Sequence, residues 1–180
     1  MEIEVRILDI DVESIRKKII DNKGVLVKKE NQVNKLFDFD DKRLLNEKGY
    51  ARIRVIEDLI LNKQVSYMCV KKAISSHTDK YKVMDEKETI INDPKVGEDI
   101  FNSLGLKLNH EIKKYRESYR LLNVLVEIDI NDKSFYPDPY IEIEGENEED
   151  IENVVKLLGY TLEDTTSMNI FELINMKYNN

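Results

Sequence analysis

The sequence sorts like-charged residues into pairs two positions apart, within segments that otherwise alternate between apolar and charged residues. Successive side chains of a β-strand point to opposite faces, so residues i and i+2 share a face and lie about 7 Å apart. Each pair therefore places two charges of one sign side by side. The six pairs are Glu2/Glu4, Arg52/Arg54, Glu86/Glu88, Lys114/Arg116, Glu127/Asp129 and Glu142/Glu144.

Two arrangements can accommodate such pairs. For a single pair, the ordinary arrangement is a solvated outer face of a sheet whose other face is the core. On an outer face, however, opposite charges are expected to mix, because unlike charges on neighbouring strands stabilise a sheet and like charges do not. Six segregated pairs favour the alternative, in which the charged phase lines the interior of a barrel and the apolar phase lies beneath helices packed outside.

Alternation and turn signals predict short strands and a few helices. Asp11, Asp93 and Asn147 are expected to cap three helices, which end at Gly24, Gly105 and Gly159. A fourth helix is expected over about 166–177. The predicted strands cover residues 3–7, 24–29, 33–39, 50–56, 65–71, 81–91, 111–121, 125–130 and 140–144.

These elements predict an α+β fold, an eight-stranded antiparallel β-barrel with helices packed outside. Parallel βαβ units would need a helix after nearly every strand, and the sequence offers too few helices for that. We find no linker in the 180 residues, so we expect a single domain over residues 1–180.

Composition excludes several classes of function. With 28 basic and 36 acidic residues, the net charge of −8 argues against a surface that binds duplex nucleic acid. One cysteine excludes an internal disulfide, and two histidines are too few for a histidine-rich metal site. The absence of a long apolar run and the acidic start predict a complete cytoplasmic protein with no membrane partner.

A charged interior predicts the ligands that it would bind. Neighbouring carboxylates raise one another's pKa, so they need a cation in order to remain ionised. Oxygen ligands without cysteine or histidine favour Mg²⁺ or Mn²⁺. The basic side chains would hold a multiply charged anion, such as a small-molecule triphosphate or polyphosphate. These basic residues are Arg52, Arg54, Lys71, Lys114 and Arg116.

Eight segments together resemble the CYTH domain, also called the triphosphate tunnel metalloenzyme superfamily. Each motif is short, but all of them occur in the family's order and span essentially the whole chain. The segments are Glu2-Ile3-Glu4-Val5-Arg6, Leu36-Phe37-Asp38, Ala51-Arg52-Ile53-Arg54, Cys69-Val70-Lys71, Glu86-Lys87-Glu88, Lys114-Tyr115-Arg116 with Tyr119, Val126–Asp129, and Tyr140–Glu144.

The resemblance implies a tunnel that binds triphosphate beside a divalent metal. It implies metal-binding or water-positioning roles for Glu2, Glu4, Glu142 and Glu144, with Glu127 and Asp129 supporting the metal side. The implied phosphate-binding residues are Arg6, Arg52, Arg54, Lys71, Lys114 and Arg116. The implied catalytic residues are Glu2, Glu4, Arg6 and Lys71, and Glu86 and Glu88 would be additional acids of the tunnel.

Two departures from the family pattern concern the site. Arg6 stands where the family's first motif has lysine, which keeps the charge but changes its geometry. Met84 stands where an arginine is often found, and Lys82 is expected to take over phosphate binding from a neighbouring position on the same strand.

Three functions remain open from the sequence. The first is a metal-dependent triphosphatase that hydrolyses inorganic tripolyphosphate or an organic triphosphate, and we favour it because no segment identifies an adenine pocket. The second is a class IV adenylyl cyclase that converts ATP to cyclic AMP and pyrophosphate. The third is a non-catalytic binder of polyphosphate or nucleotide, which Met84 motivates. A homodimer is expected only because symmetric dimers are common.

Overall fold

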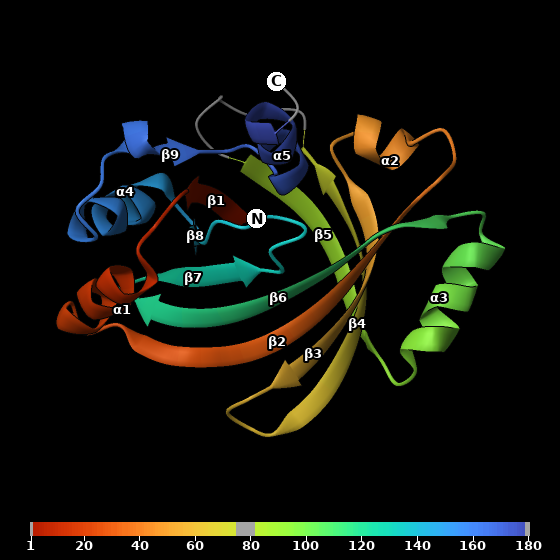
Figure 1. Ribbon diagram of the computed structural model, residues 1–180, viewed down its shortest axis with the longest axis horizontal. Coiled ribbons are helices and arrows are strands. Elements are labelled where there is room, and N and C mark those ends of the chain that lie inside the picture. Colours follow the sequence, from red (N-terminus) through yellow and green to blue (C-terminus); the bar gives the residue numbers. More distant parts are fainter. Residues whose placement is uncertain (1, 75–81, 179–180) are drawn as a thin grey trace. The chain divides into compact units, whose positions relative to one another are not determined.

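The computed structural model describes residues 2–74 and 82–178, except for the side chains of Glu2, Lys82, Val83, Lys177 and Tyr178 (Figure 1). His77 lies outside the described residues. The strands are β1 (Glu2–Ile7), β2 (Val25–Asp38), β3 (Tyr50–Asp58), β4 (Lys63–Ala73), β5 (Lys82–Ile91), β6 (Lys107–Leu121), β7 (Val124–Asn131), β8 (Tyr140–Gly145) and β9 (Thr165–Thr166). The helices are α1 (Val12–Asp21), α2 (Arg43–Asn46), α3 (Pro94–Ser103), α4 (Glu148–Leu157) and α5 (Ile170–Tyr178), with a 3₁₀ turn at Leu162–Asp164.

The chain forms two compact units, which we describe separately. Unit 1 comprises the described parts of Met1–Val27, Ser76–Val83 and Glu117–Asn180, and unit 2 those of Lys28–Ser75 and Met84–Arg116. The strand order is β6-β7-β8-β1-β9 in unit 1 and β5-β4-β3-β2-β6 in unit 2. The long strands β2 and β6 pass from one unit into the other. The single domain and the enclosed tunnel stay predictions.

The α+β fold with an antiparallel sheet is confirmed. The described residues form a sheet of nine strands, whereas the predicted barrel has eight. The stretches predicted over 24–29 and 33–39 are one strand, and the two-residue β9 beside β1 was not predicted. None of the helices in the described residues is long and apolar enough to cross a membrane.

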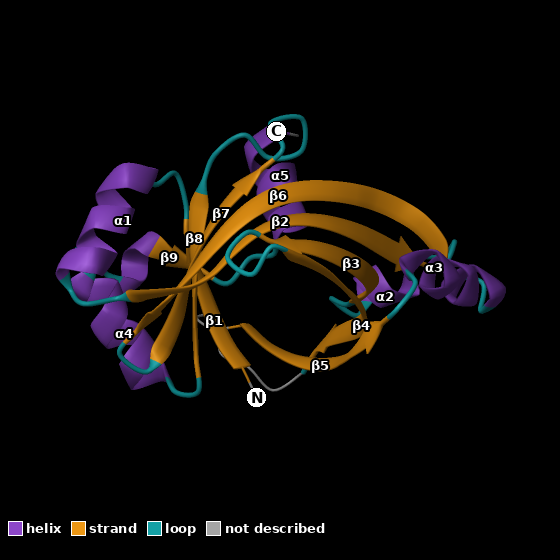
Figure 2. Ribbon diagram, turned by 90° about the horizontal axis from the view of Figure 1, so that it is seen from below, coloured by secondary structure: helices purple, strands orange, loops and turns teal. Residues whose placement is uncertain are grey.

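The core of unit 1 lies between its strands and two helices. In Figure 2, α1 and α4 lie together along one side of β1, β7 and β8. Apolar side chains of the strands, such as Val5 and Ile143, pack there against Ile19 of α1 and Val154 of α4. The helices therefore cover the apolar phase of the strands, as the alternation predicted. A smaller cluster around Tyr136, which is buried, holds α5 through Leu173.

The core of unit 2 is built in the same way around α3. Ala51 and Ile53 of β3 pack with Phe37 of β2 and with Phe101 of α3, and the rings of the two phenylalanines lie 5.2 Å apart. Gly97 of α3 is required here, because a Cβ at this position would lie 2.8 Å from Ile91 and 2.9 Å from Ile53. Again the apolar phase of the strands faces the helix.

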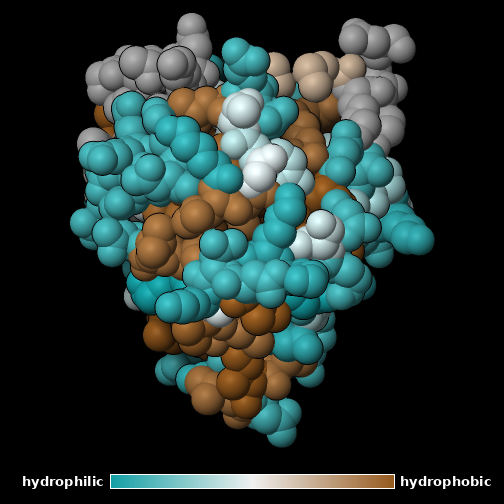
Figure 3. Space-filling view, turned by 90° about the vertical axis from the view of Figure 1, so that its left-hand side faces the viewer, coloured by the Kyte–Doolittle hydropathy of each residue, from teal (hydrophilic) through white to brown (hydrophobic). Residues whose placement is uncertain are grey.

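Several apolar residues lie outside these cores. The turn between β3 and β4 exposes three in succession, Leu59, Ile60 and Leu61. Apolar surface also gathers toward the lower end of the view in Figure 3, the end at which Figure 1 places this turn. The turn lies at the far end of β3 from Tyr50.

Predicted boundaries were wrong in three places, and one helix was not predicted. The stretches 24–29 and 33–39 are parts of one strand, β2, because polar Glu30 to Gln32 continue the ladder with β3. A short helix, α2, follows the predicted turn at 40–42, since buried Asp38 accepts hydrogen bonds from the backbone N–H groups of Leu44 and Leu45. Strand β6 begins at Lys107 instead of residue 111, and α5 begins at Ile170 instead of about residue 166.

The glycines after the helices act in two different ways. Gly105 and Gly159 have φ values of +92° and +83°, the left-handed conformation that commonly follows a helix. After α1, it is Lys23 that adopts this conformation, with φ of +64°. Gly24 is needed for space, because a Cβ there would lie 2.4 Å from Cγ2 of Ile19.

Neighbouring isoleucines of α1 provide a test of the core of unit 1. Ile19 has no exposed surface, whereas 57% of Ile20 is exposed. We expect Ile19→Ala to lower the free energy of unfolding by about 2–5 kcal/mol, because it leaves a cavity beneath the strands. Ile20→Ala should change it by less than about 0.5 kcal/mol. Urea denaturation of both variants measures the difference, and equal losses would contradict this assignment of the core.

Candidate active site

Glutamates of β1, β7 and β8 lie together on the face of the sheet that α1 and α4 leave uncovered. In the β1–β8 ladder, Glu4 lies opposite Glu144 and Arg6 opposite Glu142. In the β7–β8 ladder, Glu142 in turn lies opposite Glu127. Because directly opposite residues point to the same side, these side chains share one face, which we call the acidic face.

Arg6 is the electrostatic centre of the acidic face. Its Nε and Nη2 donate to Oε1 of Glu142 at 2.8 and 2.6 Å, and Nη2 also lies 3.1 Å from Oε1 of Glu4. Nη1 donates to the backbone carbonyl of Met168 at 2.5 Å. Burial opposes the charge of Arg6, but the two carboxylates outweigh it and raise its pKa above the ordinary value. Arg6 therefore remains a buried cation between two of the predicted metal ligands.

Buried acids lie on both faces of the sheet in unit 1. On the acidic face, Ser118 of β6 donates a hydrogen bond of 2.8 Å to Glu127, and Asp129 has no exposed surface. Glu117, also buried, points to the opposite face, where it accepts from Arg16 of α1 and from the hydroxyl of Tyr119. Burial and this bond to Glu117 raise the pKa of Tyr119 to about 12, so its hydroxyl remains a donor at neutral pH. No role was predicted for Glu117 from the sequence.

The basic residues of unit 2 lie together on the face that is opposite to Phe101 and α3. In the β3–β4 ladder, Arg52 lies opposite Cys69 and Arg54 opposite Tyr67. Lys71 lies opposite Tyr50 in the same ladder. The guanidinium of Arg54 is 5.5 Å from the Tyr67 ring centre, a separation at which a cation and an aromatic ring attract each other. We call this surface the basic face.

Two acids from β5 neutralise part of the basic face. Glu86 accepts from Arg52 at 3.1 Å and forms an ion pair of 3.1 Å with Lys71. Glu88 accepts from Arg54 at 2.7 Å. The side chains of all three cations are less than one-fifth exposed, so these ion pairs are shielded from solvent.

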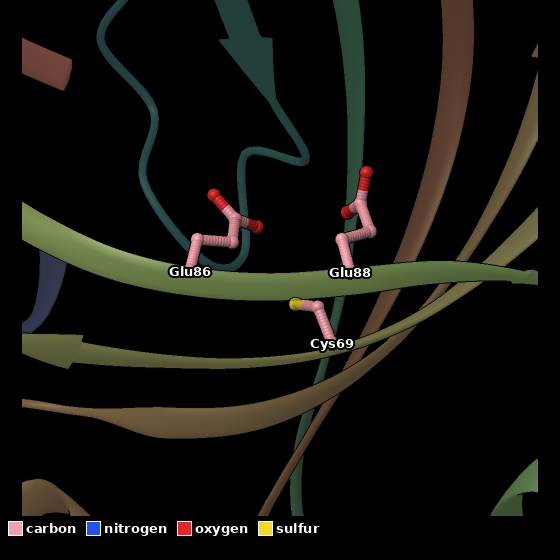
Figure 4. A group of neighbouring side chains, drawn as sticks. All are labelled: Cys69, Glu86 and Glu88. Atoms are coloured by element: carbon pink, nitrogen blue, oxygen red, sulfur yellow. The ribbon is translucent and has the colours of Figure 1, made fainter. Parts of the chain in front are cut away.

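Cys69, Glu86 and Glu88 form the one group of possible metal ligands found in the described residues. One ligand atom from each of the three lies within 4.8 Å of the others, and Figure 4 shows both carboxylates on the same side of β5 beside the sulfur. Burial raises the pKa of the Cys69 thiol. Since the carboxylates already pair with three cations, this group differs in charge from the acidic face on which metal ligands were predicted.

The other predicted site residues differ in how deeply they are buried and in whether the structure describes their side chains. Lys114 and Arg116 lie on β6, where Lys114 is half-buried and Arg116 is 8% exposed. The side chains of Glu2 and Lys82 lie outside the described part of the structure. Met84 is buried on β5 at the same phase as Glu86, so an apolar side chain occupies the position where the family often has arginine.

Three buried polar residues of β2, which we call the polar line, were not predicted from the sequence. Glu30, Gln32 and Asn34 occupy every second position, so their side chains point to the same face, and all three are buried. In the β2–β3 ladder Asn34 lies opposite Arg54, so the line belongs to the basic face. Their spacing of two was visible in the sequence, but the mixture of one acid and two amides does not form a like-charged pair.

A profile of the CYTH domain matches residues 1–168. The chain belongs to the CYTH family. The recognition that rested on eight short motifs is thereby confirmed. CYTH proteins act on triphosphates with the help of divalent metals. The acidic and basic faces must therefore be interpreted in terms of that chemistry.

Solved structures support the CYTH fold over nearly the whole chain. The PH1012 protein from Pyrococcus horikoshii OT3 is 27% identical, with a TM-score of 0.79, and the match covers 97% of this chain and 100% of that one. A proposed adenylate cyclase from Vibrio parahaemolyticus is 11% identical, with a TM-score of 0.76 and coverage of 97% of both chains. HpAC1 from Hippeastrum, a proposed adenylyl cyclase described as having a dominant triphosphatase activity, is 18% identical, with a TM-score of 0.71 and coverage of 98% and 96%. No curated protein sequence matches this CYTH chain significantly.

The ion pairs of Glu86 predict how acid affects stability. Burial opposes its charge, but Lys71 and Arg52 outweigh burial, so the pKa of Glu86 lies below the ordinary value near 4.5. A lowered pKa in the folded state stabilises the protein above the ordinary pKa, and this contribution is lost as the pH falls through the folded-state pKa. We expect Glu86→Gln to remove that part of the acid dependence, as measured by urea unfolding between pH 3 and 7.

Lys71→Met provides the matched test of the cause. It removes the attractive charge that contributes most to the shift, so the pKa of Glu86 should rise relative to the unmodified protein, as followed by carboxyl NMR. An unchanged pKa in this variant would contradict the assignment.

Proposed function

We propose that this CYTH protein is a divalent-metal-dependent enzyme that acts on a small-molecule triphosphate, most directly by hydrolysis. The observation that carries the proposal is the sorting of charge: the acidic face of unit 1 and the basic face of unit 2 each lie opposite to the helix-covered core of that unit. Burying charged groups is costly unless they bind opposite charges. A charged face in each unit is what a polyanionic ligand and its metal would use.

The basic face suits the phosphate groups. Arg52 and Arg54 present planar guanidinium groups that can bind phosphate oxygens in pairs. Lys71, which lies opposite Tyr50 and shares Glu86 with Arg52, adds a compact charge. The Nε atoms of both arginines are buried and have no hydrogen-bond partner in the described residues, so each retains a donor for a ligand. We assign phosphate binding to these three residues together with Arg6, Lys82, Lys114 and Arg116.

The acidic face suits a hard divalent cation. Glu4 and Glu142 already share a buried cationic group, the guanidinium of Arg6, so their position favours positive charge. Carboxylate oxygens are the ligands that Mg²⁺ and Mn²⁺ prefer. We propose that Glu2, Glu4, Glu142 and Glu144 would hold such a metal, supported by Glu127 and Asp129. When bound, the metal would neutralise charge on the phosphate oxygens and lower the pKa of water.

The side chains would contribute to hydrolysis by positioning and by electrostatic stabilisation. Arg52, Arg54 and Lys71 would hold the chain of phosphates and neutralise the charge that builds up on its oxygens during transfer. Glu2 and Glu4 would orient the attacking water toward the terminal phosphorus, and one of them would accept its proton. The bond from that phosphorus to the bridging oxygen would break, and the diphosphate part of the substrate would leave. Arg6 would maintain the geometry of Glu4 and Glu142 through the contacts described above.

A class IV adenylyl cyclase is the second candidate. The likeness to proteins described as proposed adenylate cyclases favours it, whereas the description of HpAC1 as having a dominant triphosphatase activity favours hydrolysis. In the cyclase, the ribose 3′-hydroxyl would attack the α-phosphorus and pyrophosphate would leave.

The third candidate is a binder without turnover. The buried, uncharged side chain of Met84 favours it.

One assay distinguishes the three functions. The protein is incubated with Mg²⁺ or Mn²⁺ and, in parallel, with tripolyphosphate, ATP and thiamine triphosphate, and the products are separated. Release of orthophosphate supports hydrolysis, and cyclic AMP with pyrophosphate supports the cyclase. Binding without any product supports the third function, and the absence of both binding and turnover would refute all three.

Glu144→Gln tests the role of the acidic face. Glu144 lies opposite Glu4, whereas a change at Glu142 would leave the buried charge of Arg6 without its nearest partner and would destabilise the fold. We expect Glu144→Gln to lower turnover by at least about 100-fold, because a metal ligand contributes several kcal/mol to transition-state stabilisation. Calorimetry should also show weaker Mn²⁺ binding.

Glu146→Gln is the matched control. Glu146 follows the same strand but is exposed, so its substitution should change neither turnover nor Mn²⁺ affinity. Equal effects of the two substitutions, or full activity of Glu144→Gln, would remove Glu144 from the site.

A further inference from the structure

The buried polar line of β2 is unusual for a sheet, because it ends in an acceptor with no partner among the residues that the structure describes. Glu30 is 8% exposed, Gln32 2% and Asn34 6%. Oδ1 of Asn34 is buried and has no hydrogen-bond partner in the described residues. Buried polar atoms are nearly always paired, so an exception requires an explanation.

The direction of the hydrogen bonds along this line is fixed by its first residue. An ionised carboxylate only accepts, and Glu30 accepts a bond of 2.5 Å from Nε2 of Gln32. Gln32 must therefore turn its carbonyl toward Asn34, whose Nδ2 lies 3.4 Å from Oε1 of Gln32. The amide of Asn34 cannot be reversed without placing two oxygens together. The acceptor at the end of the line is a consequence of this chain of bonds.

Asn34 ends the line beside the residues assigned to phosphate binding. It lies opposite Arg54 in the β2–β3 ladder, and the next residue on that face of β2 is Leu36, opposite Arg52. Arg54 donates to Glu88 and lies over Tyr67, while its Nε has no partner in the described residues. Donors for phosphate oxygens and an acceptor for a different group thus occur at neighbouring positions of one face.

The acceptor and the donors require different ligand atoms. Phosphate oxygens accept hydrogen bonds, so they can satisfy Arg54 but not Oδ1 of Asn34. Ionised inorganic tripolyphosphate carries acceptors alone. A ligand that satisfies both must carry an N–H or O–H group close to its phosphates, as the sugar hydroxyls or the base amino group of a nucleoside triphosphate do.

We propose that Asn34, oriented by Gln32 and Glu30, accepts a hydrogen bond from the organic part of the substrate and so selects an organic triphosphate, such as a nucleoside triphosphate, over inorganic tripolyphosphate. This inference rests on the proposed function of the basic face. It assigns a specificity role to a residue outside the charged pairs. Sites that bond a polar group of the correct ligand discriminate strongly against ligands that lack it.

The test compares two ligands that cannot turn over. They are the bis(methylene) analogues of ATP and of tripolyphosphate, whose bridges block hydrolysis and cyclisation and carry no donor. Both are titrated by calorimetry with Mn²⁺ into the full chain and into Asn34→Leu. We expect Asn34→Leu to weaken binding of the ATP analogue about tenfold, the value of one buried hydrogen bond, and to change binding of the inorganic analogue less than twofold.

Asn31→Leu is the matched control. Asn31 lies on β2 at the opposite phase, where it is exposed and donates to Glu57, so its substitution should alter neither affinity. If Asn34→Leu weakens both ligands equally, Asn34 only positions Arg54 and the inference is wrong. It is also wrong if binding of the ATP analogue is unchanged. If neither analogue binds the unmodified protein, the proposed function fails as well.

A second measurement needs no variant and therefore does not depend on the folding of Asn34→Leu. The unmodified protein is titrated with the ATP analogue lacking the base amino group and with the analogue lacking both ribose hydroxyls. Loss of about tenfold in affinity with one of them identifies the donor as the base or the sugar. Full affinity for both would overturn the inference.

Discussion

The structure depends on cross-strand register in an antiparallel sheet. Side chains repeat every two residues along a strand, so a shift of one residue between neighbours would exchange the helix-covered face for the charged one. The observed register instead aligns Arg6 with Glu142 and Val5 with Ile143, and it places Ala51 opposite Val70 but Arg52 opposite Cys69. Apolar burial under the helices fixes this alignment, and the charged faces follow from it. The site is in this sense a product of the core.

Each charged face contains its own opposite charges. On the acidic face, Arg6 lies between Glu4 and Glu142, and on the basic face Glu86 and Glu88 pair with arginine and lysine side chains. Such pairing makes burial of the charges tolerable before any ligand is bound. Under the proposed function, a triphosphate and its metal enter faces that are already ordered. The energy of binding is then the difference between the ligand's ion pairs and those that it replaces.

The sequence predicted the fold class and the charged faces because both follow from a period of two. It also located the caps at Asp93 and Asn147, where a side chain accepts from the first turn of a helix. The sequence did not predict the features of the fold that depend on tertiary contacts. The continuity of β2 depends on pairing with β3, and α2 depends on the buried carboxylate of Asp38. The polar line ending at Asn34 was missed for a related reason, since its meaning comes from burial and from the direction of its hydrogen bonds.

The bond from Arg6 to Met168 has a consequence for how related chains should be compared. The acceptor is a main-chain carbonyl, so any residue type at this position could provide it. The contact joins the first strand to the segment between β9 and α5, more than 160 positions away along the chain. Relatives could therefore differ freely in the identity of this residue while keeping the interaction. What is preserved in such a case is the path of the backbone, which an alignment of residue types does not record.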